Sequence, residues 1–384
     1  MCKWEMVKLS DIFTLQMGKT PSRDNPSYWN GTHKWVSIAD LGKAGKYIRD
    51  TKENITDSAV SETGIKLTPK GTVVMSFKLS IGKTAITLED IFTNEAIMAF
   101  IDRKTYLFDI DYIYHLFSGK DWNEGTNKAV MGNTLNKATL SQITIPLPPL
   151  EIQHQIASNL DKVTRLINLC NSILDRLDLL VKSRFVEMFG DPVLNSNNLP
   201  LMTLPELGEL GRGVSKHRPR NAPELLGGKY PLIQTGDVAN SELYIESYNS
   251  TYSEFGFCQS KMWCKGTLCI TIAANIAKTA ILAFDSCFPD SIVGFNANEM
   301  TNNIYIHYWF SFFQSILEAQ APESAQKNIN LKILSELKVI APPKAVQEQF
   351  ATFVEQTDKS KLAVKKVLEK AETLKKALMQ EYFG

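Results

Sequence analysis

The chain has 384 residues, of which 44% are apolar and 22% charged, and its formal net charge is +1. This composition predicts an ordered globular protein of two or three domains and excludes a disordered chain. A net charge so close to zero gives no bulk indication of nucleic-acid binding, so any basic surface must be local.

The N-terminal residues lack the apolar run of a signal peptide, and no stretch approaches the roughly 18 apolar residues that indicate a membrane span. The six cysteines form no C-x-x-C pair and have no histidine at zinc-ligand spacing. We therefore expect reduced, mostly structural thiols in a cytoplasmic protein without a metal site.

In the first 148 residues, short β-branched runs alternate with turn residues. This pattern predicts a turn and buried strand at 70–77, a second strand at 96–101 and a helix at 111–118. After Pro148 and Pro149, apolar residues recur every three or four positions, which predicts one long amphipathic helix. Its stripe comprises Ile156, Leu160, Val163, Ile167, Cys170, Leu174, Leu177, Val181, Phe185 and Met188.

A loop at 191–200 ends this helix, and a similar series of elements follows. We expect strands at 266–272 and 291–295 and a helix at 305–317. A second amphipathic stripe follows Pro342 and Pro343, although Thr357 and Lys361 weaken its middle. The apolar members of this stripe are Val346, Phe350, Phe353, Val364, Val367, Ala371, Leu374, Leu378 and Tyr382.

The second half of the chain repeats the first at an offset of 194 or 195 residues. Four anchors in the same order make a chance match improbable, and a one-residue gap reconciles their offsets. The anchors pair 70–72 with 265–267, 83–85 with 278–280, 148–155 with 342–349, and 187–190 with 381–384.

The repeat predicts an α+β fold with two related domains, residues 1–148 and 191–341, and two long helices, residues 149–190 and 342–384. A narrow apolar stripe on a helix of about 50–60 Å needs a partner helix. We expect each helix to be the partner of the other, as an antiparallel, coiled-coil-like pair with pseudo-twofold symmetry. The alternative is two unrelated helices, each packed on its own domain.

Catalytic motifs are missing from the sequence. The two Gly-Lys-Thr triplets lack the first glycine of a phosphate-binding loop, and residues 25–28 match the Asn-Pro-Pro-Tyr motif of amino-methyltransferases without its second proline. Asp40, Asp237 and Asp290 are isolated carboxylates of the kind found in turns and helix caps. We therefore predict a non-catalytic chain without a cofactor of its own.

Basic and polar residues gather instead on three pairs of loops, at matching places in the two repeats. Such side chains on flexible loops suit phosphate contacts and bidentate reading of base edges, although solvated surface loops have the same composition. In the first pair the candidate DNA-binding residues are Lys19, Thr20, Ser22, Arg23, Tyr28 and Trp29, and Arg212, Ser215, Lys216, His217, Arg218 and Arg220. The second pair contributes Lys78, Ser80 and Lys83, and Asn275 and Lys278. The third contributes Asn133, and Gln326 and Lys327.

With these residues the whole chain resembles the specificity subunits of type I restriction–modification systems. The resemblance depends on the Gly18-x-Thr20-Pro21-Ser22 motif, on the segments 28–29 and 35–41, and on the proline pairs that precede Gln153 and Gln347. The second half has no Tyr-Trp pair after its basic loop, which fits two domains that read different half-sites.

The resemblance implies that each domain recognises one half of a bipartite double-stranded DNA site through the major groove. It implies that the helices set the spacer and dock two methyltransferase subunits, which bind S-adenosylmethionine and methylate adenine. Separate translocase–nuclease subunits would complete the complex. If the helices are a ruler, inserting about four residues should lengthen the spacer by one or two base pairs.

Two other interpretations remain open from the sequence. One is the recognition subunit of a methyltransferase-only or type IIB-like system, which differs only in its partner subunits. The other is a scaffold whose paired domains bind proteins rather than DNA. For a scaffold, charge reversal at Arg218 and Arg220 should leave binding intact.

Overall fold

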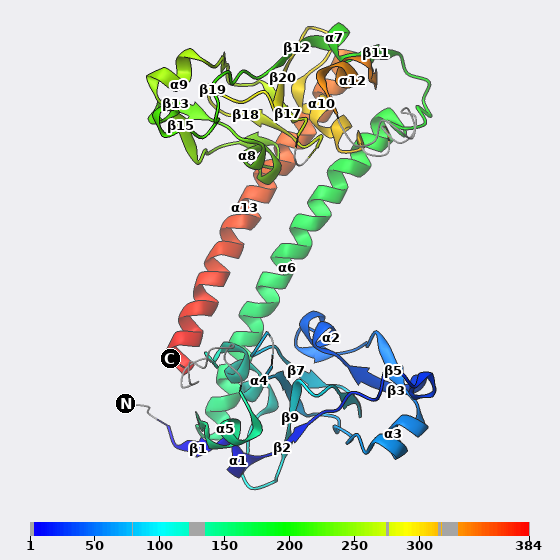
Figure 1. Cartoon of the computed structure of the whole chain (residues 1–384), viewed down its shortest axis with the longest axis vertical. Helices are drawn as coiled ribbons and strands as arrows, with labels where there is room; N and C mark the ends of the chain where they lie inside the picture. The colour runs from blue at the N-terminus through cyan, green and yellow to red at the C-terminus, as the bar shows by residue number, and fades with distance from the viewer. Residues whose placement is uncertain are drawn as a thin grey trace. The chain divides into compact units, whose positions relative to one another are not determined.

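The computed structural model describes residues 4–78, 80–122, 135–273, 276–313, 316 and 329–383. Its contacts divide the chain into two compact units: unit 1 is Met1–Asn171 with Lys366–Gly384, and unit 2 is Ser172–Lys365. The boundaries fall within the two long helices, so each unit contains one globular domain and part of both helices (Figure 1).

The domain of unit 1 is built on a five-stranded sheet in the order β2-β9-β6-β7-β4. Neighbouring strands pair antiparallel except β7 with β4, which are parallel. All residues of β6 and β7 are buried, so both faces of the sheet's centre are covered. The strands are β2 (Phe13–Met17), β9 (Ile97–Asp102), β6 (Val73–Ser76), β7 (Thr84–Thr87) and β4 (Tyr47–Ile48).

Smaller elements surround this sheet. A three-stranded sheet consists of β5 (Glu53–Ile55), β3 (Trp29–Val36) and β8 (Phe92–Thr93), and a two-stranded sheet consists of β1 (Met6–Lys8) and β10 (Thr144–Pro146). The helices are α1 (Leu9–Ile12), η1 (Pro26–Tyr28), α2 (Ile38–Lys43), α3 (Asp57–Thr63), α4 (Ile110–Gly119), α5 (Lys137–Gln142) and the start of α6 (Leu150–Phe189).

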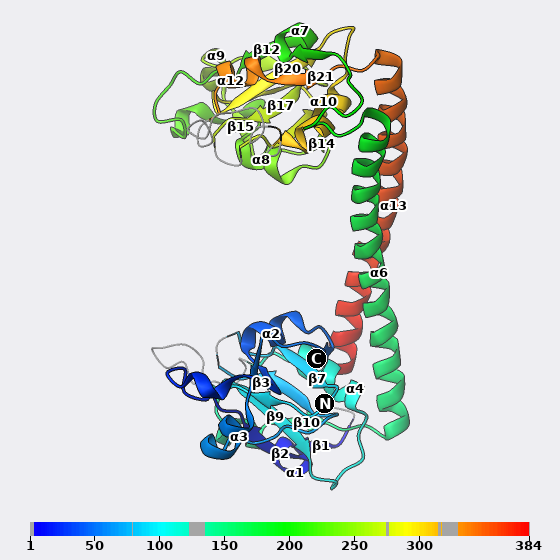
Figure 2. The same ribbon diagram turned by 90° about the vertical axis from the view of Figure 1, so that its right-hand side faces the viewer.

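The core of unit 1 joins this domain to both long helices. Phe13, Phe100 and Phe117 meet edge to face at its centre, with ring centroids 4.7–6.3 Å apart. Leu160 of α6 is fully buried in the same cluster, and Met379 near the end of α13 (Lys344–Phe383) packs against it. The end of α13 therefore lies beside the start of α6 within unit 1 (Figure 2).

Unit 2 repeats this architecture. Its five-stranded sheet has the order β12-β20-β17-β18-β14, and again only the last pair is parallel. The strands are β12 (Gly208–Arg212), β20 (Ile292–Ala297), β17 (Leu268–Thr271), β18 (Thr279–Leu282) and β14 (Tyr244–Ile245).

Smaller elements again accompany the central sheet of unit 2. A four-stranded sheet consists of β15 (Ser250–Tyr252), β13 (Leu226–Leu232), β19 (Ser286–Cys287) and β16 (Met262–Trp263), and a two-stranded sheet consists of β11 (Leu201–Thr203) and β21 (Lys338–Ile340). The remaining helices are α7 (Leu204–Leu207), η2 (Pro223–Leu225), α8 (Thr235–Asn240), α9 (Glu254–Cys258), α10 (Asn303–Phe310) and α12 (Leu331–Glu336).

The matching strand orders confirm the duplication and the α+β class. The strands predicted around 70–77, 96–101, 266–272 and 291–295 are β6, β9, β17 and β20, and the helix predicted at 111–118 is α4. The helix predicted at 305–317 is α10, which ends at Phe310. Ser311 donates its N–H to Tyr308 O, three residues back, in a tight turn that interrupts the predicted single helix. Phe313 and Ile316 are helical again, whereas residues 314, 315 and 317 lie outside the described residues.

The long helices α6 and α13 each contain 40 residues, and buried or half-buried positions recur along them in steps of three and four. In α13 this pattern passes through Thr357, Lys361 and Ala371, while Val367 and Leu374 are exposed. The prediction that Val367 and Leu374 belong to the buried stripe was wrong. It followed the apolar residues, whereas the 3.5-residue heptad repeat determines which face of the helix is buried. Within the described residues, no helix has the length and apolar character that a membrane crossing needs.

In unit 2 the two helices pack antiparallel. Phe185 near the end of α6 meets Phe350 near the start of α13, with ring centroids 5.5 Å apart. Further along, Asp178 forms an ion pair with Lys361, whose side chain is only 7% exposed. The polar middle of the predicted stripe is therefore an ion pair between the helices, of the kind that fixes register.

A buried glutamine anchors each long helix to its domain. Gln153 is fully buried; its side chain accepts from the N–H of Asp109, the N-cap of α4, and donates to Pro148 O, both at 2.8 Å. Gln347 makes the same connection in unit 2, accepting from the N–H of Asn302 at 3.3 Å and donating to Pro342 O at 2.8 Å. The proline-pair and glutamine motif is thus the joint between helix and domain.

We expect Gln153→Leu to lower the stability of unit 1 by about 2–4 kcal/mol, because it leaves one buried N–H and one buried carbonyl without partners. Chemical denaturation of the full chain would measure this change. Gln155→Leu, at an exposed position on the same helix, is the control and should change stability little. Equal effects of the two substitutions would contradict the role of the joint.

His307 of α10 gives unit 2 a pH-dependent stability. Its Nδ1 lies 3.0 Å from Thr279 Oγ1, and burial lowers the pKa of His307 from 6.5 to about 4. The unfolded chain therefore takes up this proton at a higher pH than the folded chain. We expect stability to fall as pH drops from about 6.5 toward 4, by about 2 kcal/mol at pH 5. Denaturation midpoints at pH 7 and pH 5 should differ less in His307→Gln than in the parent.

Candidate nucleic-acid interface

In unit 1 two of the candidate loops meet at one end of the central sheet. The N–H of Gly18, after β2, donates to Ile97 O at 3.2 Å. The N–H of Phe77, after β6, donates to Ala96 O at 3.0 Å. Both loops therefore flank the turn that precedes β9. We call this end of the sheet, and its counterpart in unit 2, the loop end.

Unit 2 has the same arrangement. The N–H of Gly213, after β12, donates to Ile292 O at 2.9 Å, and the N–H of Ile272, after β17, donates to Ser291 O at 3.0 Å. The turn before β20 thus lies between the two loops. Loops that are distant in sequence come together in both domains at corresponding places.

Close backbone approach explains the glycine that opens the first loop in each repeat. A Cβ atom on Gly18 would lie 2.1 Å from Thr93 O, and one on Gly213 would lie 2.3 Å from Pro289 O. No side chain fits at either position without moving backbone. The glycine in the Gly-x-Thr-Pro motif is therefore required by the fold.

Arg23 makes contacts within its own domain in the first loop of unit 1. Its guanidinium group lies 3.9 Å above the Trp29 ring and donates to both carboxylate oxygens of Glu53, at 2.5 and 2.9 Å. This hydrogen bonding raises the pKa of Arg23 and lowers the pKa of Glu53. The Trp29 indole N–H donates to Ser22 O at 3.1 Å, so Trp29 supports the loop from within.

The other predicted residues of this loop also contact their own domain. Ser22 accepts from the N–H of Asp24, whereas its side chain is exposed. The remaining contacts are Lys19 Nζ to Thr63 O at 2.5 Å, the Thr20 hydroxyl to the Glu95 carboxylate, and the Tyr28 hydroxyl to Glu62 at 2.9 Å.

In unit 2 three arginines of the first loop converge on Asp290, in the turn before β20. Arg218 Nη2 lies 3.4 Å from one carboxylate oxygen, and Arg220 pairs with the other. Arg212 Nε donates to the Asp290 carbonyl oxygen at 2.5 Å. Asp290 was expected to be only a turn or capping residue; it lies in a turn, but its carboxylate is bound by arginine.

Gln259 fixes the backbone of the same loop by accepting from the N–H groups of Lys216 and His217, at 2.6 and 3.0 Å. The Lys216 side chain is exposed, and His217 Nε2 lies 3.6 Å from Glu224. Ser215 is buried, and its hydroxyl has no hydrogen-bond partner among the described residues. Lys216 and the arginines, unlike Ser215, are thus accessible to a ligand.

The second pair of loops presents exposed residues at the loop end. Ser80, Lys83 and Lys278 are exposed, and Lys78 is half-buried over the Phe77 ring. Lys278 also lines a pocket of about 500 Å³ beside α6 and α13 in unit 2. The structure therefore brings these lysines and the first loops to the same end of each sheet. Four predicted residues lie outside the described residues: Asn133, Asn275, Gln326 and Lys327.

Sequence reasoning missed the acidic partners of the basic loops, Glu53, Glu95 and Asp290. A signal for two of them was present. Glu95 and Asp290 are 195 residues apart, which is the offset of the repeat in this region. Asp40 and Asp237, in contrast, are helix-capping residues as predicted, in boxes with Ser37 and Gln234.

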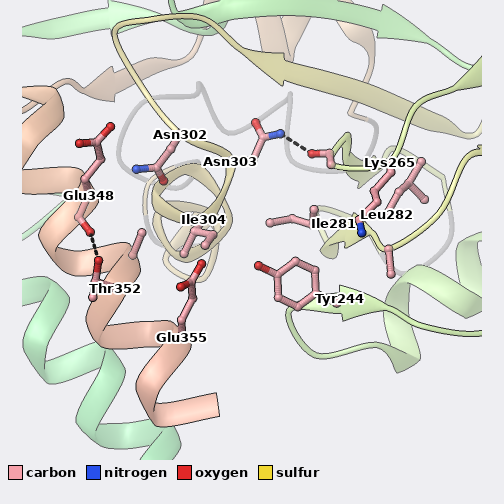
Figure 3. Close-up of a pocket in the computed structure, with 13 residues that line it drawn as sticks. Tyr244, Lys265, Ile281, Leu282, Asn302, Asn303, Ile304, Glu348, Thr352 and Glu355 are labelled. Atoms are coloured by element: carbon pink, nitrogen blue, oxygen red, sulfur yellow. Dashed lines mark hydrogen bonds between the residues drawn. The ribbon is translucent and has the colours of Figure 1, made fainter. Parts of the chain in front are cut away.

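Another cavity lies at the joint between helix and domain. In unit 2, a pocket of about 670 Å³ has Ile281, Leu282 and Tyr244 on one side and Glu348 and Glu355 of α13 on the other (Figure 3). A smaller pocket of about 380 Å³ lies at the same place in unit 1. Its lining includes Asp109, Asp111, His154, Ala157 and Asp161. Neither pocket contains the candidate DNA-binding residues.

Asp161 of α6 connects that helix to the domain of unit 1. It accepts from Lys46 at 2.6 Å and from His115 at 2.8 Å. Burial opposes ionisation of Asp161, but these two hydrogen bonds outweigh it and lower the pKa of Asp161. Over the described residues, no group of three or more His, Cys, Asp and Glu side chains is placed to hold a metal ion.

The family model "Type I restriction modification DNA specificity domain" matches the chain twice, over residues 1–179 and 201–375. The MjaIX specificity subunit of a type I restriction enzyme from Methanocaldococcus jannaschii is 32% identical over 192 residues. That alignment covers 48% of this chain and 44% of the relative. The chain therefore spans less than half the length of this relative.

Two solved structures share the fold. A chain from a structure of complex assembly and conformational transition in the type I R-M system has a TM-score of 0.62 at 17% identity, covering 99% of this chain and 97% of its own. The S subunit of the type I restriction–modification system from M. genitalium has a TM-score of 0.59 at 15% identity, covering 100% of this chain and 96% of its own. At these identities the likeness concerns the architecture of two domains and two long helices.

Proposed function

Because this chain belongs to the family of type I restriction–modification DNA specificity domains, we propose that it is a non-catalytic subunit that selects a DNA sequence. The observation that carries this proposal is the repeated loop end. Each domain gathers basic residues on two loops around one turn, and the two sets differ in sequence. Two similar frames with different side chains suit two different half-sites.

We assign residues 1–148 and 191–341 to the two DNA-reading domains, and residues 149–190 and 342–384 to the helices that separate them. The exposed members of the loops are suited to phosphate and base-edge contacts. Residues such as Trp29 and Gln259 are suited to hold those loops in shape. In this assignment both kinds of residue serve recognition, one by contact and the other by preorganisation.

The proposed protein partners are two methyltransferase subunits, which would carry S-adenosylmethionine and methylate adenine, together with restriction subunits in a complete cytoplasmic complex. The exposed apolar residues of α6 support docking on the helices, because large apolar side chains in water favour a partner. These residues are Leu166, Leu169, Leu179 and Leu180, between 40% and 64% exposed. A methyltransferase-only or type IIB-like system would use the same chain with other partners.

The first test is methylome sequencing of a host that carries this chain and its methyltransferase, compared with a host that lacks only this chain. We expect a split motif with a fixed gap that disappears on deletion. Unchanged methylation, with the methyltransferase confirmed active, would contradict the proposal and favour a protein-binding scaffold.

Single lysine substitutions should weaken binding through one half-site at a time. We expect Lys83→Ala in unit 1 and Lys216→Ala in unit 2 each to reduce the salt dependence of DNA binding by about one ion, because each removes one phosphate contact. The measurement is binding of the assembled chain and methyltransferase to the methylated motif across a salt series. Scrambling the half-site read by the substituted domain should remove most of the effect.

Matched controls lie at the opposite end of the same sheets. Lys70 and Lys265 are exposed and precede β6 and β17, whereas the loops follow those strands. Alanine at either position removes one positive charge, as the loop substitutions do, but at the end of the sheet away from the loops. If Lys70→Ala and Lys265→Ala weaken binding as much as the loop substitutions, the loop end is not the DNA-binding surface.

The ruler hypothesis is tested by lengthening both helices together. Insertions of seven residues after Asn171 and after Lys365 preserve the heptad pattern and add about 10 Å to each helix. We expect the spacer of the methylated motif to grow by about three base pairs. An active complex with an unchanged spacer would argue against the ruler.

A further inference from the structure

We propose that Asp290, and Glu95 at the equivalent position of the first repeat, is an internal counterion that competes with DNA phosphate for the basic loop. In this role it limits binding to DNA of the wrong sequence and so determines specificity. The inference rests on the proposed function and adds residues that oppose non-specific binding to those that make contacts.

The contacts of Asp290 carry this inference. Its carboxylate oxygens accept from Arg218 and Arg220, and within the described part of the chain they have no other hydrogen-bond or ion-pair partner. The neighbouring Asp285 differs, since it accepts the backbone N–H of Lys265 at 2.7 Å and so closes a turn. The carboxylate of Asp290 thus holds arginine side chains without capping backbone.

The repeat supplies an equivalent turn in unit 1, where the carboxylate meets a hydroxyl rather than arginine. Ile97 and Ile292 each donate their N–H to the carbonyl three residues back, Asn94 O and Pro289 O, at 3.2 and 3.0 Å. The next residue, Glu95 or Asp290, is thereby placed at the loop end. Glu95 accepts from the Thr20 hydroxyl, and its charge also contributes to the raised pKa of Arg23.

Carboxylate and phosphate present similar pairs of oxygens to a guanidinium group, so one can replace the other. The pairs are also exchangeable: the side chains of Arg218, Arg220 and Asp290 are 55%, 46% and 24% exposed, and ion pairs so open to water are weak. DNA of the wrong sequence must displace the carboxylate with phosphate contacts alone. DNA of the correct sequence gains base contacts as well, which offset the cost of displacing the carboxylate.

The loop has more positive than negative charge even with its counterion. Arg212, Lys216, Arg218 and Arg220 contribute four positive charges, which Asp290 only partly neutralises. Attraction to DNA is therefore reduced rather than abolished. Removal of the carboxylate should add about one effective positive charge to non-specific binding.

The experiment measures binding of the assembled full-length chain and its methyltransferase to a duplex with the methylated motif and to one of scrambled sequence. In Asp290→Asn we expect affinity for the scrambled duplex at about 0.1 M salt to rise roughly five- to tenfold, with a salt slope steeper by about one. Affinity for the motif should rise less, so the ratio of motif affinity to scrambled-duplex affinity should fall. Asp290→Glu should behave like the parent.

Glu299→Gln is the control for net charge, because Glu299 is exposed in unit 2 outside the loop and has no ion pair within the described residues. Equal tightening in this variant, or unchanged or weaker scrambled binding in Asp290→Asn, would overturn the inference. If Asp290→Asn fails to fold in a thermal melt, Glu95→Gln tests the same prediction in unit 1. A parent complex that binds neither duplex would overturn the proposed function itself.

Discussion

A fully buried side-chain amide anchors the start of each long helix to its domain. Gln153 and Gln347 accept from the backbone where α4 and α10 begin, and donate to the carbonyl of the first proline before the helix. Because both partners are backbone groups, the connection fixes the direction in which the helix leaves the domain. The loop ends and the helix faces are then parts of one rigid frame within each unit.

The paired helices combine an apolar seam with a polar interruption. Lys361 is buried opposite Asp178, in the position where a continuous apolar stripe would allow the helices to slide by a heptad. The Asp178 side chain is 62% exposed and Lys361 also lies 3.7 Å from Asp358 on its own helix, so the pair contributes little net stability. A shifted register would remove the contact between Lys361 and Asp178 that joins the two helices. The polar interruption in the apolar stripe of α13 therefore favours one register of the two helices.

Local patterns were sufficient to predict much of the fold. The duplication, the buried strands β6 and β17 and both long helices were visible because each depends on spacing along the chain. The exposure of Val367 and Leu374 was not, since a face set by the heptad repeat overrides the apolar character of single residues. The end of α10 at Phe310 likewise depends on a tight turn that apolar periodicity does not reveal.

The candidate site was predicted less completely. The basic residues of the loops are recognisable from composition, but their partners come from segments distant in sequence. Glu53 is 30 residues from Arg23, and Asp290 is 70 residues from Arg220. Trp29, a candidate DNA contact, supports the loop backbone through its indole N–H and Arg23 through its ring, which composition does not reveal. Such assignments require the tertiary structure, because both roles use the same residue types.

The composition of the two units has a consequence for how the protein forms in the cell. Unit 2 is a continuous segment, but unit 1 needs both Met1–Asn171 and Lys366–Gly384. A ribosome therefore delivers every residue of the second unit before it delivers those that complete the first. Until Leu378, Met379 and Tyr382 emerge, the apolar surface they cover in unit 1 is open. The domain that is translated first is thus the last to be finished.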